Sequence, residues 1–254
     1  MAIKNEFRLY FKKELENSNI LRIILNEIFD KGTAYIIGGY FRDFLMKKEP
    51  RDIDMLVETS HSFLLEILHK KNIPYTVNRH KGIKVKLEEK SLDIWTVENN
   101  WAFKEKLITF KEDDKLNSIA KGCFYNYDAL VINLRDYSYN LRYYKKFVDS
   151  KVLDIFYSST EYMNLNETVE ANVLRALYLK KIHNVSFSDR TRRYLINKIG
   201  ELADNNESVV DVLDLTISKY PKYTKELNYK KLMHLLDELY SETNNENSQL
   251  FLNL

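Results

Sequence analysis

The sequence predicts an α+β protein in which a domain built around a β-sheet precedes an all-helical domain. Two observations lead to this prediction. Residues 34–97 contain short apolar runs separated by glycine turns and polar loops, whereas beyond about residue 150 the apolar residues recur only at helical spacing. We therefore expect one domain at residues 1–149 and a helical domain at 150–254.

The expected elements follow in chain order. A leading helix covers roughly residues 5–29, and the sheet continues to about residue 137, with a helix at about 60–71 that Ser60 caps. The second domain contains helices at about 167–183, 188–203, 207–219 and 228–242.

The most informative stretch is residues 34–57. An apolar run leads into Gly38 and Gly39, a short helical segment follows, and Asp52 and Asp54 open a second apolar run. The glycines can adopt backbone angles closed to other residues, and they present bare N–H groups at a helix start, where phosphate is favoured. The two carboxylates leave the same face of a strand, where a divalent metal would offset their repulsion. A phosphate cradle beside such a pair indicates nucleotidyl transfer.

A third carboxylate follows in a predicted β-hairpin. In residues 79–97, Ile83, Val85 and Leu87 alternate with lysines, a charged turn follows, and Asp93 lies between apolar residues of the returning strand. Asp93 fits the third carboxylate that two-metal transfer normally uses. The alternative is an edge-strand aspartate that faces water.

The order GG-x-x-RD followed by a DID strand resembles the head domain of class II tRNA nucleotidyltransferases and bacterial poly(A) polymerases, which belong to the DNA polymerase β-like nucleotidyltransferase superfamily. The resemblance implies a polymerase β-like head with a mixed sheet, followed by a helical, neck-like domain. It also implies that Asp52, Asp54 and Asp93 hold two Mg²⁺ ions, with Mn²⁺ as the alternative. Gly38 and Gly39 would hold the triphosphate of an NTP.

Two further matches concern the nucleotide. Arg42 and Asp43 match the family's Arg-Asp pair, so we expect Arg42 near phosphate and Asp43 in a supporting role. Residues 125–129 (YNYDA) resemble the family's FTINA, without the RRD that precedes it there. Asn126 and Asp128 are therefore either nucleotide or ribose contacts or partners of local backbone groups.

The helix expected at residues 166–181 resembles the family helix EDPLRILRAIRFA at its LRA core, which contains Arg175. Arg175 faces either the nucleotide cleft or a structural acidic partner. Thr168, Val169 and Asn172 stand where the family helix has its acid pair and first arginine, which read the incoming base in relatives. The sequence therefore does not select ATP, CTP or another NTP.

Basic residues interleaved with tyrosine form two clusters, a pattern that suits a phosphate backbone with stacked bases. The first cluster, residues 142–146, is more typical of a solvated helix face with extended lysine chains. The second predicts a surface for an RNA acceptor and contains Arg190, Arg192, Arg193 and Lys198.

Composition predicts a cytoplasmic enzyme that does not enter a membrane. Charged residues make up 30% of the chain and the net charge is +2. No apolar run approaches the roughly 18 residues of a membrane span. The charged N-terminus lacks a signal peptide's apolar stretch. Cys123, as the one cysteine, excludes an intramolecular disulfide and a cysteine-based zinc site.

These features predict a metal-dependent nucleotidyltransferase that transfers NMP from an NTP to an acceptor hydroxyl, with a tRNA-like RNA 3′ end preferred because of the family resemblance. Two alternatives stay open. One is transfer to a small molecule or protein, as in antibiotic-modifying and toxin-type members. The other is a non-catalytic RNA- or nucleotide-binding module, against which the three acidic residues argue. Class II relatives continue into further domains that bind tRNA, and for this sequence we expect that contact to come from a partner chain or homo-oligomer or to be unnecessary.

Overall fold

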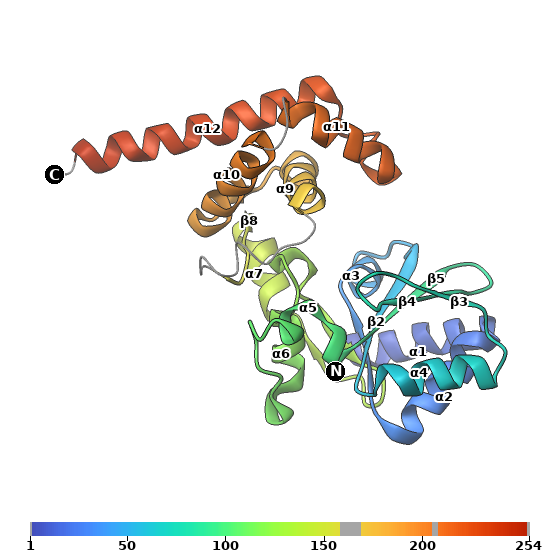
Figure 1. Cartoon of the computed structure of the whole chain (residues 1–254). Coiled ribbons are helices and arrows are strands. Elements are labelled where there is room, and N and C mark those ends of the chain that lie inside the picture. Colours follow the sequence, from blue (N-terminus) through green and yellow to red (C-terminus); the bar gives the residue numbers. More distant parts are fainter. Residues whose placement is uncertain (1, 158–168, 205–207, 253–254) are drawn as a thin grey trace. The chain divides into compact units, whose positions relative to one another are not determined.

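The computed structural model describes residues 2–157, 169–204 and 208–252. The chain forms two compact units, Met1–Lys146 and Phe147–Leu254, and each is described by itself (Figure 1). The boundary at residue 149/150 that the sequence suggested falls within the same helix, α7 (Arg142–Ser150).

In the described part of the first unit, the central feature is a seven-stranded sheet with strand order β3-β4-β5-β2-β1-β6-β7. Strands β2 and β5 are parallel, and the other neighbouring pairs are antiparallel. This mixed sheet confirms the predicted α+β class. The strands are β1 (Ala34–Ile37), β2 (Asp52–Val57), β3 (Tyr75–Val77), β4 (Ile83–Lys86), β5 (Ser91–Thr96), β6 (Val131–Asn133) and β7 (Tyr139–Asn140).

Helices α1 (Ala2–Asn17), α2 (Asn19–Lys31) and α4 (His61–Lys70) lie along one side of this sheet (Figure 1). The prediction of one continuous leading helix is wrong, because Ser18 ends α1 and caps α2 by accepting a hydrogen bond from the Leu21 N–H at 3.3 Å. The predicted cap of α4 is confirmed, since the Ser60 hydroxyl accepts from the Phe63 N–H at 3.2 Å. Serine at such positions satisfies N–H groups that have no partner inside the helix.

These helices and the sheet enclose an apolar core, and the alternation of strand residues decides which side chains enter it. On β2 the fully buried Ile53 and Met55 belong to this core. Asp52 and Asp54 therefore point to the opposite side of the sheet, which we call the second face. Helix α3 (Gly39–Leu45) follows β1 and packs its aromatic rings against α1.

Shorter elements complete the first unit between β5 and β6. They are η1 (Val97–Asn99), α5 (Trp101–Lys104), η2 (Glu112–Asp114), α6 (Lys115–Lys121) and η3 (Asn126–Asp128). The last of these is a single turn of 3₁₀-helix that lies directly before Ala129 and β6.

The second unit is helical, as predicted. Its helices are α9 (Val169–His183), α10 (Asp189–Asp204), α11 (Val209–Lys219) and α12 (Tyr229–Leu252), with one turn, η4 (Pro221–Tyr223), between the last two. Strands β8 (Val152–Leu153) and β9 (Ser186–Phe187) form a small parallel pair. None of the helices described in either unit is both long enough and apolar enough to cross a bilayer.

Candidate active site

The glycine turn joins β1 to α3. Gly38 has φ +64° and ψ −123°, a backbone conformation that glycine adopts readily and that residues with a side chain rarely adopt. Its N–H donates to the Leu130 carbonyl at 3.0 Å, and its own carbonyl accepts from the Arg42 N–H at 3.1 Å. The predicted sequence of strand, glycine turn and helix is confirmed, and the turn is held in place by the segment that leads into β6.

Arg42 lies beside this turn and is held from several sides. Its Nη1 donates to Asp128 Oδ1 at 3.0 Å, and its guanidinium lies 4.3 Å from the centre of the Tyr127 ring. Its Nη2 is close enough to Gly39 that a Cβ there would be 3.5 Å away. The buried Nε lies 3.5 Å from Asp43 Oδ1 but makes no hydrogen bond. Arg42 thus places a fixed guanidinium next to the glycine turn.

The three predicted carboxylates share the second face. Strands β2 and β5 run parallel with Asp54 paired directly to Asp93, and Asp52 is two residues before Asp54. Neighbouring strands lie about 4.8 Å apart. The β1–β2 pairing ends at Ile36 and Met55, so the glycine turn begins beside the Asp54 end of β2. The glycine turn after β1, the aspartates of β2 and Asp93 of β5 therefore lie in one region of the sheet.

Basic side chains compensate two of these carboxylates. Asp52 Oδ2 accepts from Arg51 Nη2 at 2.6 Å, and Asp93 Oδ2 accepts from Lys84 Nζ at 3.0 Å. The hydrogen bond to Asp52, together with the nearby negative charge of Asp54, raises the pKa of Arg51. The positive charge of Arg51 offsets the repulsion between the neighbouring carboxylates of Asp52 and Asp54.

Among the residues that the structure describes, no group of three or more His, Cys, Asp or Glu side chains is gathered to hold a metal ion. The donor chemistry nevertheless fits Mg²⁺ or Mn²⁺, because carboxylate oxygens are the ligands these ions prefer. Asp54 and Asp93 occupy paired positions, and Arg51 and Lys84 show that the region attracts positive charge.

The remaining nucleotide candidates belong to different elements of the two units. Asn126 is buried in η3 next to Tyr127, while Asp128 contacts Arg42. Arg175 and Asn172 lie on α9 in the second unit, and Thr168 lies outside the described residues. The structure thus brings Arg42, Asp43 and Asp128 together near the glycine turn.

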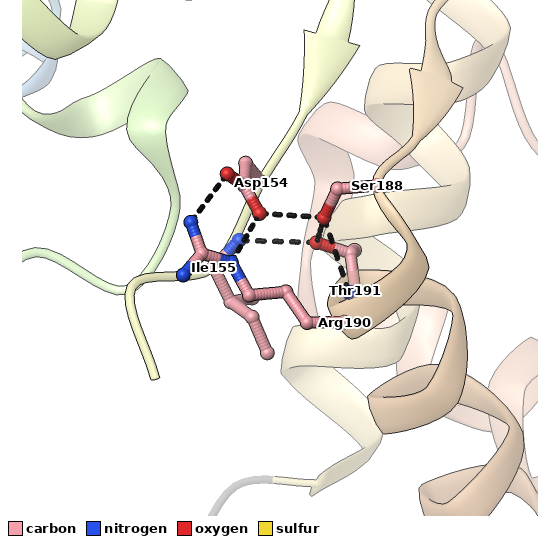
Figure 2. Close-up of polar contacts among 5 residues, drawn as sticks. All are labelled: Asp154, Ile155, Ser188, Arg190 and Thr191. Atoms are coloured by element: carbon pink, nitrogen blue, oxygen red, sulfur yellow. Dashed lines mark hydrogen bonds and ion pairs between the residues drawn. The ribbon is translucent and has the colours of Figure 1, made fainter. Parts of the chain in front are cut away.

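The predicted RNA surface on α10 needs correction, because its residues do not form one exposed basic face. Lys198 is only 2% exposed and binds Glu201 at 2.8 and 2.9 Å. Arg190 makes a two-pronged ion pair with Asp154, at 2.7 and 2.5 Å (Figure 2). This pairing raises the pKa of Arg190.

The other two α10 arginines differ from each other. The Arg192 side chain is 11% exposed, whereas Arg193 is exposed and its Nε lies 3.4 Å from the Asp189 carbonyl. In Figure 2 the Ser188 hydroxyl also donates to Asp154 and the Thr191 hydroxyl accepts from the Ile155 N–H. The residues at the start of α10 therefore have a structural role, because they bind Asp154 and Ile155 after β8 through hydrogen bonds and an ion pair.

Three residues near the candidate site were not predicted: Arg51, Lys84 and Tyr127. A signal existed for two of them. Arg51 directly precedes Asp52, and Lys84 alternates with apolar residues on a hairpin strand. The position of Tyr127 under Arg42 joins segments 85 residues apart, which local sequence pattern cannot show.

Residues 34–161, just over half of the chain, match the family model for the poly A polymerase head domain. No curated protein matches the chain.

Several solved structures are similar to this one. A CCA-adding enzyme in complex with CTP has 16% identity and a TM-score of 0.60, covering 88% of this chain and 51% of that one. A tRNA-processing enzyme with CTP has 18% identity and a TM-score of 0.58, with coverages of 85% and 56%. The Thermotoga maritima CCA-adding enzyme complexed with tRNA has 16% identity and a TM-score of 0.59, with coverages of 87% and 50%. The chain spans about half the length of these proteins, and at such identities the likeness concerns the fold.

The mixed sheet with its glycine turn defines a head domain of the nucleotidyltransferase class, which a helical unit follows in the chain. The chain belongs to the poly A polymerase head domain family.

Proposed function

We propose that the chain is a cytoplasmic, metal-dependent nucleotidyltransferase that transfers NMP from an NTP to the 3′ hydroxyl of an RNA, with a tRNA-like 3′ end as acceptor. One observation carries the proposal: Asp54 and Asp93 are paired on neighbouring parallel strands, on the same face as Asp52 and beside the glycine turn. The similarity to proteins described as CCA-adding enzymes with CTP and with tRNA supports the choice of NTP and RNA.

Each residue has a distinct part in the reaction. Asp52 and Asp54 would hold two Mg²⁺ ions, which neutralise charge on the α-phosphate when bound. Asp93 would help hold these ions, which when bound would position the acceptor hydroxyl and lower its pKa, so that the hydroxyl loses its proton to water as its oxygen attacks the α-phosphorus. The bond from that phosphorus to the bridging oxygen breaks, and pyrophosphate leaves toward Arg42 and the turn at Gly38.

Arg42 suits this part because it does not have to be organised during the reaction. Asp128 and the Tyr127 ring already fix its guanidinium, so its charge is in place when the leaving group develops negative charge. Asp43, 3.5 Å from the Arg42 Nε, limits its movement from the other side.

Transfer from the four α-phosphate-labelled ribonucleotides to RNA, in the presence of Mg²⁺, tests the proposal. Label should enter RNA from one or more of them, and Asp54→Asn should reduce transfer by about 100-fold or more. The matched control is Asp30→Asn, which removes an exposed carboxylate from α2 and should leave transfer unchanged.

Two further readouts complete this test. Mn²⁺ binding followed by electron paramagnetic resonance should weaken in Asp54→Asn but not in Asp30→Asn, independently of turnover. A labelled product that survives ribonuclease would replace RNA with a small-molecule or protein acceptor. Nucleotide binding without transfer to any acceptor would leave a binding module.

A further inference from the structure

Four side chains form one lateral row across the second face. Asp54 on β2 is paired with Asp93 on β5, Asp93 with Lys84 on β4, and Lys84 with Thr76 on β3. Directly paired residues in a sheet project on the same side. The carboxylates of the proposed active site are therefore continued, strand by strand, by a lysine and a threonine.

A second lateral row runs parallel to the first. Asp52 is paired with Ser91, and Ser91 with Lys86. Ile83 and Val85 are buried in the core, so Lys84 and Lys86 both point to the second face, about 6.6 Å apart along β4. Both lysines are exposed, and the Lys84 side chain is 55% accessible to solvent.

We infer that Lys84 and Lys86 form an acceptor-strand surface that binds the phosphate backbone of a single-stranded RNA 3′ end next to Asp93. The inference rests on the proposed function and names how the acceptor is selected. Three carboxylates on neighbouring strands repel a polyanion as it approaches. Lys84 and Lys86 on β4, the strand next to Asp93, attract the phosphate backbone and oppose this repulsion.

The ion pair between Lys84 and Asp93 is compatible with this role. It is formed by a largely exposed lysine, and pairs of that kind contribute little to stability. Lys84 can therefore exchange the carboxylate for a phosphate at little cost. Lys86 is paired with Ser91, an uncharged residue, so its charge is not explained by compensation of a carboxylate. A small uncharged acceptor would gain nothing from either lysine, so the surface favours RNA.

The test measures binding of a fluorescent single-stranded RNA to the full chain by anisotropy, over a range of salt concentrations and without NTP or divalent metal. The variants are Lys84→Gln/Lys86→Gln and Lys86→Gln alone. The matched control, Lys12→Gln/Lys13→Gln, removes the same charge from exposed positions on α1. Each phosphate contact to a single strand contributes about 0.7 to the slope of log K against log salt. The slope should fall by about 1.4 in the double variant, by about 0.7 in Lys86→Gln, and not in the control.

Equal slopes for the double variant and the control would overturn the inference. A slope that falls in the double variant but not in Lys86→Gln would also overturn the inference. The loss would then come from Lys84 alone, which would be only the counterion of Asp93. The measurement requires no turnover, so its failure is distinct from that of the proposed function. Normal transfer together with unchanged slopes refutes the lysine surface alone, whereas altered slopes together with full transfer by Asp54→Asn refute the catalytic assignment alone.

Discussion

Gly38 offers the sharpest test of how the glycine turn is built. In Gly38→Ala the new Cβ has room, since its nearest contact is the Asp128 carbonyl oxygen at 3.7 Å. The cost therefore comes from the backbone alone, which stays at φ +64° and ψ −123°. Such conformations cost of the order of 1–3 kcal/mol for a residue with a side chain. With a urea m-value of about 2 kcal/mol/M, a loss of about 2 kcal/mol lowers the unfolding midpoint by about 1 M.

Gly200→Ala is the matched control, because Gly200 lies inside α10 and a methyl group added there would meet nothing within 4 Å. Alanine should raise stability there by about 0.5–1 kcal/mol. Both tryptophans, Trp95 and Trp101, are in the first unit, so their fluorescence follows unfolding of the Gly38 variant, while far-UV circular dichroism follows the Gly200 variant. A Gly38→Ala protein as stable as the parent would refute the argument that this backbone needs glycine.

Three further predictions concern polar groups. Arg42→Ala should lower the unfolding free energy of the first unit by about 1–3 kcal/mol, because it removes a charged hydrogen bond to Asp128 and the contact with the Tyr127 ring. Asp128→Ala should add less in this background than alone. The Ser18 hydroxyl donates to Glu88 and lowers the pKa of that carboxyl in the folded protein. The hydrogen bond therefore stabilises the fold above the pKa of Glu88 in the unfolded chain, about 4.3. This stabilisation is lost as the pH falls through the lower pKa of Glu88 in the folded protein. In Ser18→Ala, urea unfolding at a series of pH values should show a smaller decrease in the free energy of unfolding as the pH is lowered. Lys198→Met should leave both stability and RNA affinity close to those of the parent, because this buried lysine does not face solvent.

Each of these has a contrasting result. Additive losses in the Arg42 and Asp128 variants would show that their contact carries no energy. Ser60→Ala also removes a helix cap, but the Ser60 hydroxyl contacts the Ser62 hydroxyl and the Phe63 N–H rather than a carboxylate, so the resulting loss of stability should depend on pH less than that of Ser18→Ala. Weakened RNA binding by Lys198→Met, measured by anisotropy, would restore α10 as an RNA surface.

The local sequence pattern was sufficient to predict the structure wherever residues close together in the chain determine it. The glycine turn follows from backbone freedom at Gly38, and the shared face of Asp52 and Asp54 follows from the two-residue repeat of a strand. The break at Ser18 was missed because both flanking segments are helical, and one capping serine divides them. A signal for the burial of Lys198 was present, since it lies four residues after Tyr194 on the buried face of α10.

The sequence by itself determined that a sheet domain precedes a helical one, the turn that begins α3 and the shared face of Asp52 and Asp54, because these depend on residues close together in the chain. Only the tertiary structure decided which residues meet: Asp54 with Asp93, Asp93 with Lys84, and Arg42 with Asp128. Strand register and the packing of distant segments fix those pairs. Both are set by burying the whole apolar face of the sheet at once, a property that no local stretch of sequence contains.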